Sequence, residues 1–291
     1  MALTHDTPIP VPDGWMLAKY LKVGDYVMSW SGQPIQIKSI QTYTPKEMYE
    51  VTLNDGISFQ ADQHTKLPVE TSYDRTNEAN LKHKYKRWKK QRYATIADML
   101  TTGLLTKRNR KFYAVSNSKP VQFLTEDHPV PPFIVGMWMT RRNKTNTYSI
   151  PEDRMDYVKK EIKLVGWSYK LVGTNLLEIR PSIANSFLTR YFAIPATLPI
   201  EYTFGNVDQR IDLLRGLLAI RPNCYDTTTH RFRIQSTDLK FLTTIQGVCE
   251  SLGIKTALFS RSSCFSHVLT FKDRKSTRLN SSHVSESRMP S

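Results

Sequence analysis

The sequence predicts a mainly β N-terminal part followed by an α+β part that is built from two similar repeats. Up to about residue 70, short runs of alternating polarity are separated by glycine-containing turns. After the prolines at 129, 131 and 132, apolar residues recur at helical spacing. From there, one order of helices and strand pairs occurs twice along the chain. A chain of 291 residues with 40% apolar content is long enough for two hydrophobic cores.

The N-terminal part is expected to contain strands at 26–30, 35–43 and 48–53. Turns are expected at Asp13-Gly14, Ser31-Gly32 and Asn54-Asp55-Gly56. Thr95 and Asp98 form a capping pair, so a helix is expected to follow and to end at Gly103. Residues 82–92 are basic and interleaved with aromatics. This stretch has two equal interpretations, a phosphate- and base-contacting segment or a solvated extension.

The two repeats can be followed element by element. The first is expected as helix 133–139, strand 147–150, helix 152–165, strand pair 167–180 and helix 182–191. The second is expected as helix 209–219, strand 231–236, helix 237–252 and strand pair 254–271, without the last helix. Gly166 and Gly253 end the two apolar stripes that define the middle helices. We therefore expect one domain at 1–128 and a second at 129–272.

The last segment, 273–291, resembles a translated sequencing adapter, so we expect it to be an artefact outside the fold. The alternative is a native, disordered polar tail. Removing the segment takes away four basic and two acidic residues, so the chain stays strongly basic.

The amino-acid composition limits the classes of function that are expected for this chain. The formal charge of +15 favours a polyanionic partner, with nucleic acid as the leading candidate. The three cysteines form no C-x-x-C pair, which argues against a disulfide scaffold and a structural zinc site. No run is long and apolar enough for a bilayer span or a signal peptide. The chain is therefore expected in the cytoplasm, without a membrane partner.

Two blocks near the N-terminus carry a first resemblance. They read ALTHDTPIPVPDG at 2–14 and LKVGDYV at 21–27, and YEVTLNDG at 49–56 and ADQH at 61–64 follow them. These blocks resemble the opening motifs of inteins. The resemblance implies the N-terminal part of a horseshoe-like, mainly β Hint fold, autocatalytic protein splicing and a flanking extein host protein. His64 matches the histidine that activates the upstream amide in that chemistry.

Two positions depart from the intein pattern. Ala2 stands at the position of the usual nucleophile, and a methyl group cannot attack a carbonyl. The resemblance then implies an alanine-type intein, in which the downstream extein residue attacks directly. Ala61 replaces the threonine that usually precedes the histidine by three residues. No terminal His-Asn block is found, so the alternatives are a longer gene that splices or a non-splicing remnant. Taken alone, His64 is also compatible with an ordinary turn histidine.

A second resemblance lies in PFIVGMWMTRRN at 132–143 and LLRGLLAIRPN at 213–223. Both are similar to the helices of LAGLIDADG (DOD-type) homing endonucleases, which are encoded by mobile elements. The resemblance implies a monomer with an internal pseudo-twofold axis, where small residues, Gly136 and Gly216, allow close helix contact. It also implies double-stranded DNA as the partner.

In that family each helix ends in an acid, and the two acids hold Mg²⁺. Here Arg141 and Arg221 stand at those positions, and a guanidinium cannot ligate Mg²⁺. We therefore expect no metal cofactor and an inactive endonuclease. Two alternatives stay open. One is a DNA-binding module that has kept the scaffold, and the other is an active nuclease with displaced acids, for which Asp226 is the candidate.

The strand pairs of the two repeats are the expected DNA-contacting surfaces, as the resemblance implies. Their basic residues are Lys170, Arg180, Arg231, Arg233, Lys255 and Arg261. Some of these residues are expected to be ordinary surface charge.

Overall fold

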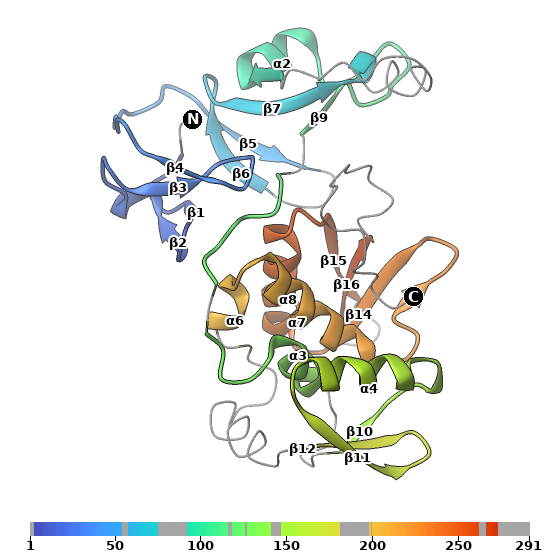
Figure 1. Cartoon of the computed structure of the whole chain (residues 1–291). Helices are drawn as coiled ribbons and strands as arrows, with labels where there is room; N and C mark the ends of the chain where they lie inside the picture. The colour runs from blue at the N-terminus through green and yellow to red at the C-terminus, as the bar shows by residue number, and fades with distance from the viewer. Residues whose placement is uncertain are drawn as a thin grey trace, which may run out of the picture. The chain divides into compact units, whose positions relative to one another are not determined.

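The computed structural model describes residues 3–53, 58–74, 92–115, 118–125, 127–140, 147–180, 198, 200–261 and 266–272, with the backbone alone at Arg261 and Lys272. The fold is mixed α/β with small antiparallel sheets (Figure 1). Contacts divide the chain into two compact units. Unit 1 comprises residues 1–11, 15–30 and 34–118, and unit 2 comprises residues 12–14, 31–33 and 119–291. No described helix is long and apolar enough to cross a bilayer.

The β-strands of the N-terminal part pair locally, mostly as hairpins. They are β1 (Pro8–Val11), β2 (Gly14–Leu17), β3 (Tyr26–Met28), β4 (Pro34–Gln36), β5 (Met48–Thr52), β6 (Ser58–Asp62), β7 (Lys66–Thr71), β8 (Arg92–Thr95) and β9 (Tyr113–Val115). They pair as β1-β2, β3-β4, β5-β6 and β8-β7-β9. The strand expected at 35–43 is wrong beyond Gln36. Ile40 and Tyr43 are about half exposed, so their apolar character does not reflect a buried strand face.

The hydrophobic core of unit 1 is small. It contains Ala61, Leu67, Val69, Ala94, Ile96 and Met99. Helix α2 (Ile96–Thr102) begins at the predicted capping box, where Asp98 N donates to Thr95 Oγ1 over 3.0 Å and Thr95 N donates to the Asp98 carboxylate over 2.9 Å. The helix ends at Gly103, whose φ of +88° suits glycine. The predicted start and end of this helix are confirmed.

Two repeats with one strand order make up the α/β part of unit 2. The first contains α3 (Pro132–Thr140), β10 (Thr147–Ser149), α4 (Met155–Leu164), β11 (Ser168–Gly173) and β12 (Leu176–Arg180). The second contains α7 (Val207–Ala219), β13 (Tyr225–Asp226), β14 (Arg231–Ser236), α8 (Leu239–Ser251), β15 (Thr256–Arg261) and β16 (Ser266–Lys272). The sheets are ordered β10-β12-β11 and β13-β14-β16-β15, so the first matches β14-β16-β15 strand for strand.

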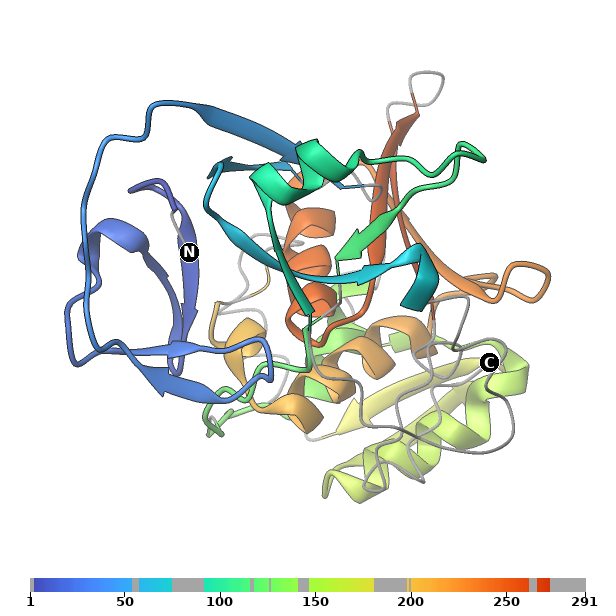
Figure 2. The ribbon, with the colours of Figure 1, turned by 90° about the horizontal axis from the view of Figure 1, so that it is seen from above.

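Most of the predicted elements of the repeats are confirmed. The helix expected at 152–165 differs slightly, because a 3-10 turn (Glu152–Arg154) precedes α4. The helix expected at 182–191 lies outside the described residues. A short helix, α6 (Glu201–Phe204), was not predicted, since four residues leave no periodic pattern. Figure 2 shows α4 lying along the β11-β12 pair, which is how the first repeat covers its sheet.

One core serves both repeats. Ile134, Val135 and Met137 of α3 and Leu213, Leu214, Leu217 and Leu218 of α7 are completely buried in it. The helices cross at Gly136 and Gly216. A Cβ on Gly136 would lie 2.7 Å from Leu217 N, and a Cβ on Gly216 would lie 3.0 Å from Phe133 Cα. Because those obstacles are backbone atoms, only glycine permits this separation of the helix axes.

A fully buried arginine forms a hydrogen bond to the segment that precedes α3. Arg210 of α7 donates from Nε to Gly205 O over 2.8 Å, from Nη1 to Ser251 Oγ over 2.5 Å and from Nη2 to Val121 O. Its guanidinium also lies over the ring of Phe123, 4.9 Å from the centroid. Burial lowers the pKa of Arg210 to about 10, so the group stays charged at neutral pH.

Candidate functional site

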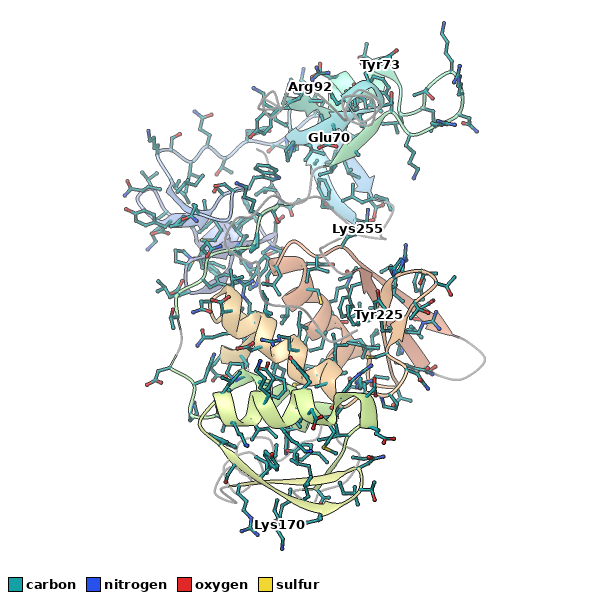
Figure 3. The ribbon with its side chains drawn as sticks, turned by 45° about the vertical axis from the view of Figure 1, so that its right-hand side comes forward. Glu70, Tyr73, Arg92, Lys170, Tyr225 and Lys255 are labelled. Carbon is teal, nitrogen blue, oxygen red and sulfur yellow. The ribbon has the colours of Figure 1, made fainter. Side chains whose placement is uncertain are left out.

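The outer faces of the two sheets carry the basic residues that the sequence singled out. On β14, Phe232 and Ile234 point into the core, so Arg231 and Arg233 lie on the opposite, exposed face. On the first sheet, Leu177 and Ile179 are buried, which leaves Arg180 exposed on the other face of β12. Lys170 is exposed on β11 opposite Glu178, and Figure 3 shows it pointing away from the sheet.

The remaining two predicted contacts lie at the margins of the second sheet. Lys255 is exposed immediately before β15 (Figure 3). The backbone of Arg261 pairs with Ser266 at the far end of β15, and its side chain lies outside the described residues. The basic stretch at 82–92 is described only at Arg92, which begins β8 and lies 3.8 Å from the Asp74 carboxylate.

An open hollow of about 480 Å³ occupies the outer face of the second sheet. It is lined by Asp226, Thr229, Arg231, Arg233, Phe259 and Thr270. Register explains the grouping, because Arg233 of β14 is opposite Thr270 of β16. The hollow therefore brings together two of the predicted basic residues with an acid and an aromatic ring from β13 and β15.

Arg141 and Arg221 are the two residues that the sequence analysis compared with the endonuclease acids. Arg141 lies outside the described residues. Arg221 follows α7 and is half-buried, with Nη1 donating to Gln235 O over 3.2 Å and the guanidinium 5.9 Å from the centroid of Phe241. Arg221 is thus held against β14 and α8 of its own repeat.

A second guanidinium lies at the same helix end. Arg154, from the first repeat, donates through Nη1 to Leu218 O over 2.7 Å and to Arg221 O over 2.8 Å. Leu218 O lies in the last turn of α7 and Arg221 O just beyond it, where the helix dipole favours a positive charge. Mg²⁺ requires anionic oxygen ligands. The residues described at this end of α7 instead supply guanidinium groups, so they do not fit a divalent cation.

The two repeats are joined by a further polar cluster between α4 and α7. Arg215 donates to Glu161 Oε1 over 2.8 Å, to Tyr157 Oη over 2.8 Å and to Asp212 Oδ1 over 3.0 Å. The side chains of Arg215 and Glu161 are only 15% and 11% exposed. Burial raises the pKa of Tyr157 to about 12, so its hydroxyl stays protonated and accepts from Arg215.

In unit 1, His64 lies in the turn between β6 and β7 and is exposed. Its ring nitrogen Nε2 is 3.1 Å from Gln63 Nε2. Ala2, which the sequence analysis compared with the intein nucleophile, lies outside the described residues. Ala61 is buried in the core of unit 1 at the end of β6, three residues before the histidine.

The carboxylate of Asp62 organises the turn that carries His64, and sequence reasoning missed it. Thr65 Oγ1 and Tyr43 Oη each donate to it over 2.5 Å. Burial alone would raise the pKa of Asp62. The hydrogen bonds from Thr65, Tyr43 and the His64 N–H outweigh that effect and hold the pKa below its usual range. The ADQH block contained the signal, since an aspartate beside a turn commonly accepts local hydrogen bonds.

Arg154 and Arg215 were missed as well, because a charged residue in a helical pattern is ordinarily assigned to the surface. The position of Asp226, the acid of the hollow, could have been predicted from the sequence. Asp226 precedes three threonines, a composition typical of a turn closed by the aspartate side chain.

The chain is similar to a curated protein sequence. The chain is 27% identical over 225 residues to a replicative DNA helicase DnaB of Mycobacterium intracellulare. The match covers 75% of this chain, and the chain spans about a third of the length of that relative, 37%. No family model matches the sequence.

Solved structures of the homing endonuclease I-DmoI are similar to parts of the chain. Its mesophilic variants match with a TM-score of 0.35 and 14% identity, over 50% of this chain and 89% of theirs. I-DmoI in complex with DNA and Mn matches with a TM-score of 0.34 and 14% identity, over 49% of this chain and 88% of that chain. The complex with DNA and Ca gives a TM-score of 0.33 and 13% identity, over 50% and 83%.

Proposed function

We propose that this chain is a fragment of an alanine-type intein whose endonuclease-like domain binds double-stranded DNA without cutting it. The internal symmetry of unit 2 is the main support for the proposal that this domain binds DNA. Helices α3 and α7 meet through reciprocal glycines, and each repeat adds a sheet in which three strands follow the same order, with basic residues on its outer face. Exposed cations on two such faces suit the phosphate backbone of a duplex.

The absence of cleavage is proposed from the end of α7. Metal-dependent hydrolysis of a phosphodiester needs carboxylates that hold the metal and activate water. By the resemblance, Arg221 stands at the position of the second acid, and it donates to Gln235 O, while Arg154 donates to Leu218 O in the last turn of α7. These contacts favour a structural use of both arginines over a catalytic one.

The splicing part rests on the intein-like blocks and on His64. The horseshoe-like Hint fold, the boundaries at 1–128 and 129–272, the adapter-like tail and the cytoplasmic location are part of this proposal. The similarity to a replicative DNA helicase supports such a helicase as the flanking host protein. Because Ala2 cannot form an ester, His64 would act on the upstream amide while the nucleophile comes from the downstream host segment.

The DNA-binding proposal is tested with the full chain and a pool of randomised duplex oligonucleotides over a range of salt concentrations. We expect binding that weakens as salt rises, and no nicking of the pool with Mg²⁺ present. Magnesium-dependent nicking that disappears in Asp226→Asn would establish the displaced-acid nuclease instead. No duplex binding at low salt would overturn the proposal for unit 2.

The splicing proposal is tested by placing the chain between two reporter domains. We expect no ligated product from the chain as it stands, since no His-Asn block is supplied. A ligated band on a gel would contradict that expectation. If a downstream segment ending in His-Asn is supplied, we expect ligation, and its loss in His64→Ala while the reporters remain intact.

A further inference from the structure

The hollow on the second sheet combines groups that a plain phosphate-binding surface would not combine. Two exposed arginines, Arg231 and Arg233, share it with the carboxylate of Asp226. A phosphate would be attracted by the guanidinium groups and repelled by the carboxylate. A ligand that fits all three must present hydrogen-bond acceptors and donors side by side.

Asp226 is held in position as an anion. Its Oδ1 accepts from Thr228 N over 2.9 Å and from Thr229 N over 3.2 Å, and its Oδ2 accepts from Thr229 Oγ1 over 2.8 Å. The Thr229 hydroxyl is the main cause that holds the pKa of Asp226 below its usual range, and the charge of Arg233 adds to it. Because a carboxylate has about four acceptor positions, these three bonds leave capacity for a ligand donor.

The two arginines of the hollow are available for binding. Within the described part of the chain, no hydrogen bond or ion pair is found for the guanidinium of Arg231 or Arg233. Arg180 on the first sheet differs, since its Nη2 lies 3.8 Å from the carboxylate of Glu178. The hollow therefore combines a fixed carboxylate acceptor, Asp226, with two guanidinium groups that are free to bind a ligand. Arg180 on the first sheet is not free in this way.

We propose that this hollow recognises one G·C base pair in the major groove of bound DNA. Arg233 donates to O6 and N7 of the guanine, and Asp226 accepts from the N4 amino group of the cytosine, which are the contacts those edges permit. Phe259, 54% exposed on β15, lines the same hollow and offers an apolar contact such as a neighbouring thymine methyl group. This inference rests on the proposed binding of duplex DNA by unit 2.

The test begins with the full chain and the duplex that it selects from a randomised pool. Each base pair of that duplex is then changed in turn, and binding is measured by fluorescence anisotropy. At one G·C pair we expect a preference of about 5- to 150-fold, the size of one well-formed bidentate contact. Arg233→Ala and Asp226→Asn should each abolish or change the preference at that pair and leave the other positions as they were.

Lys170→Ala is the matched control on the other sheet. It should weaken binding to all sequences equally and reduce the salt dependence, as expected for a phosphate contact. If Arg233→Ala and Asp226→Asn also act equally on all sequences, the base-reading role is overturned while the proposed function stands. If the unmodified chain binds no duplex, both fail. Circular dichroism of each variant checks that the fold is retained.

Discussion

Gly136 of α3 and Gly216 of α7 each pack against the backbone of the other helix, and the two contacts are equivalent. A methyl group on Gly136 would meet Leu213 O, and one on Gly216 would meet Phe133 O. In each case the obstacle is the carbonyl three residues before the other glycine. This reciprocity is a direct structural sign that α3 and α7 are related by an approximate twofold axis.

Gly216→Ala is expected to destabilise unit 2. The added methyl group meets backbone, so α3 and α7 must separate, and overpacking of this kind costs about 1–3 kcal/mol or more. Denaturant unfolding followed by circular dichroism measures the effect, because most described helices belong to unit 2.

Gly247→Ala on α8 is the matched control for Gly216→Ala. Nothing lies within 4 Å of a Cβ at Gly247, so alanine should be neutral or stabilise by up to about 1 kcal/mol. Equal losses in both variants would contradict the close-contact argument.

Arg154→Met should also destabilise unit 2. Methionine keeps the length of the side chain but removes the guanidinium that donates to Leu218 O in the last turn of α7 and to Arg221 O just beyond it. The arginine side chain is 7% exposed, so we expect a loss of about 2–4 kcal/mol in the free energy of unfolding. Arg180→Met, at an arginine 53% exposed, should change it by less than about 1 kcal/mol. Similar values for the two variants would argue against the capping role of Arg154.

The pair Glu161 and Arg215 should couple the repeats energetically. A double-mutant cycle with Glu161→Gln and Arg215→Met is expected to give a coupling energy of about 1–3 kcal/mol, because both side chains are mostly buried. The corresponding cycle for Asp156 and Lys159, where the aspartate is 98% exposed, should give less than about 0.5 kcal/mol. A coupling energy near zero at the first pair would mean that solvent screens it as well.

Asp62 should make the stability of unit 1 depend on pH in the acid range. Its pKa is lower in the fold than the ordinary value of 3.8. The stabilisation is therefore complete above pH 3.8 and is lost as the pH falls through the lower, folded pKa. Backbone amide signals of β6 and β7, followed by NMR during an acid titration, measure the change. In Asp62→Asn the acid-dependent part should disappear. An unchanged titration would assign it to another group.

The helices of both units could be predicted from the sequence because their signals are local or periodic. Apolar stripes, a capping pair and glycines at helix ends act over a few residues, and they located α2, α4, α7 and α8 closely. The strand expected at 35–43 failed because a strand also needs a partner, and apolar residues such as Ile40 occur on the surface as well.

The candidate site was less accessible to sequence reasoning. Arg231 and Arg233 could be chosen by charge and alternation, but their grouping with Asp226 and Phe259 depends on the register of β14, β16 and β15. The roles of Arg154 and Arg215 depend on which helices meet. Neither pairing leaves a local signal, since both join residues more than 50 positions apart.

In unit 2 the residues of the shared core are distinct from the polar residues at the end of α7. Phe133 to Met139 and Leu213 to Ala219 supply the packing, while Arg221 lies just beyond the last turn of α7. A substitution at such a helix end changes a polar group that lies outside the apolar interior. Single substitutions there can therefore alter the polar surface while the packing stays, whereas deletion of a whole repeat would expose the interior of the other.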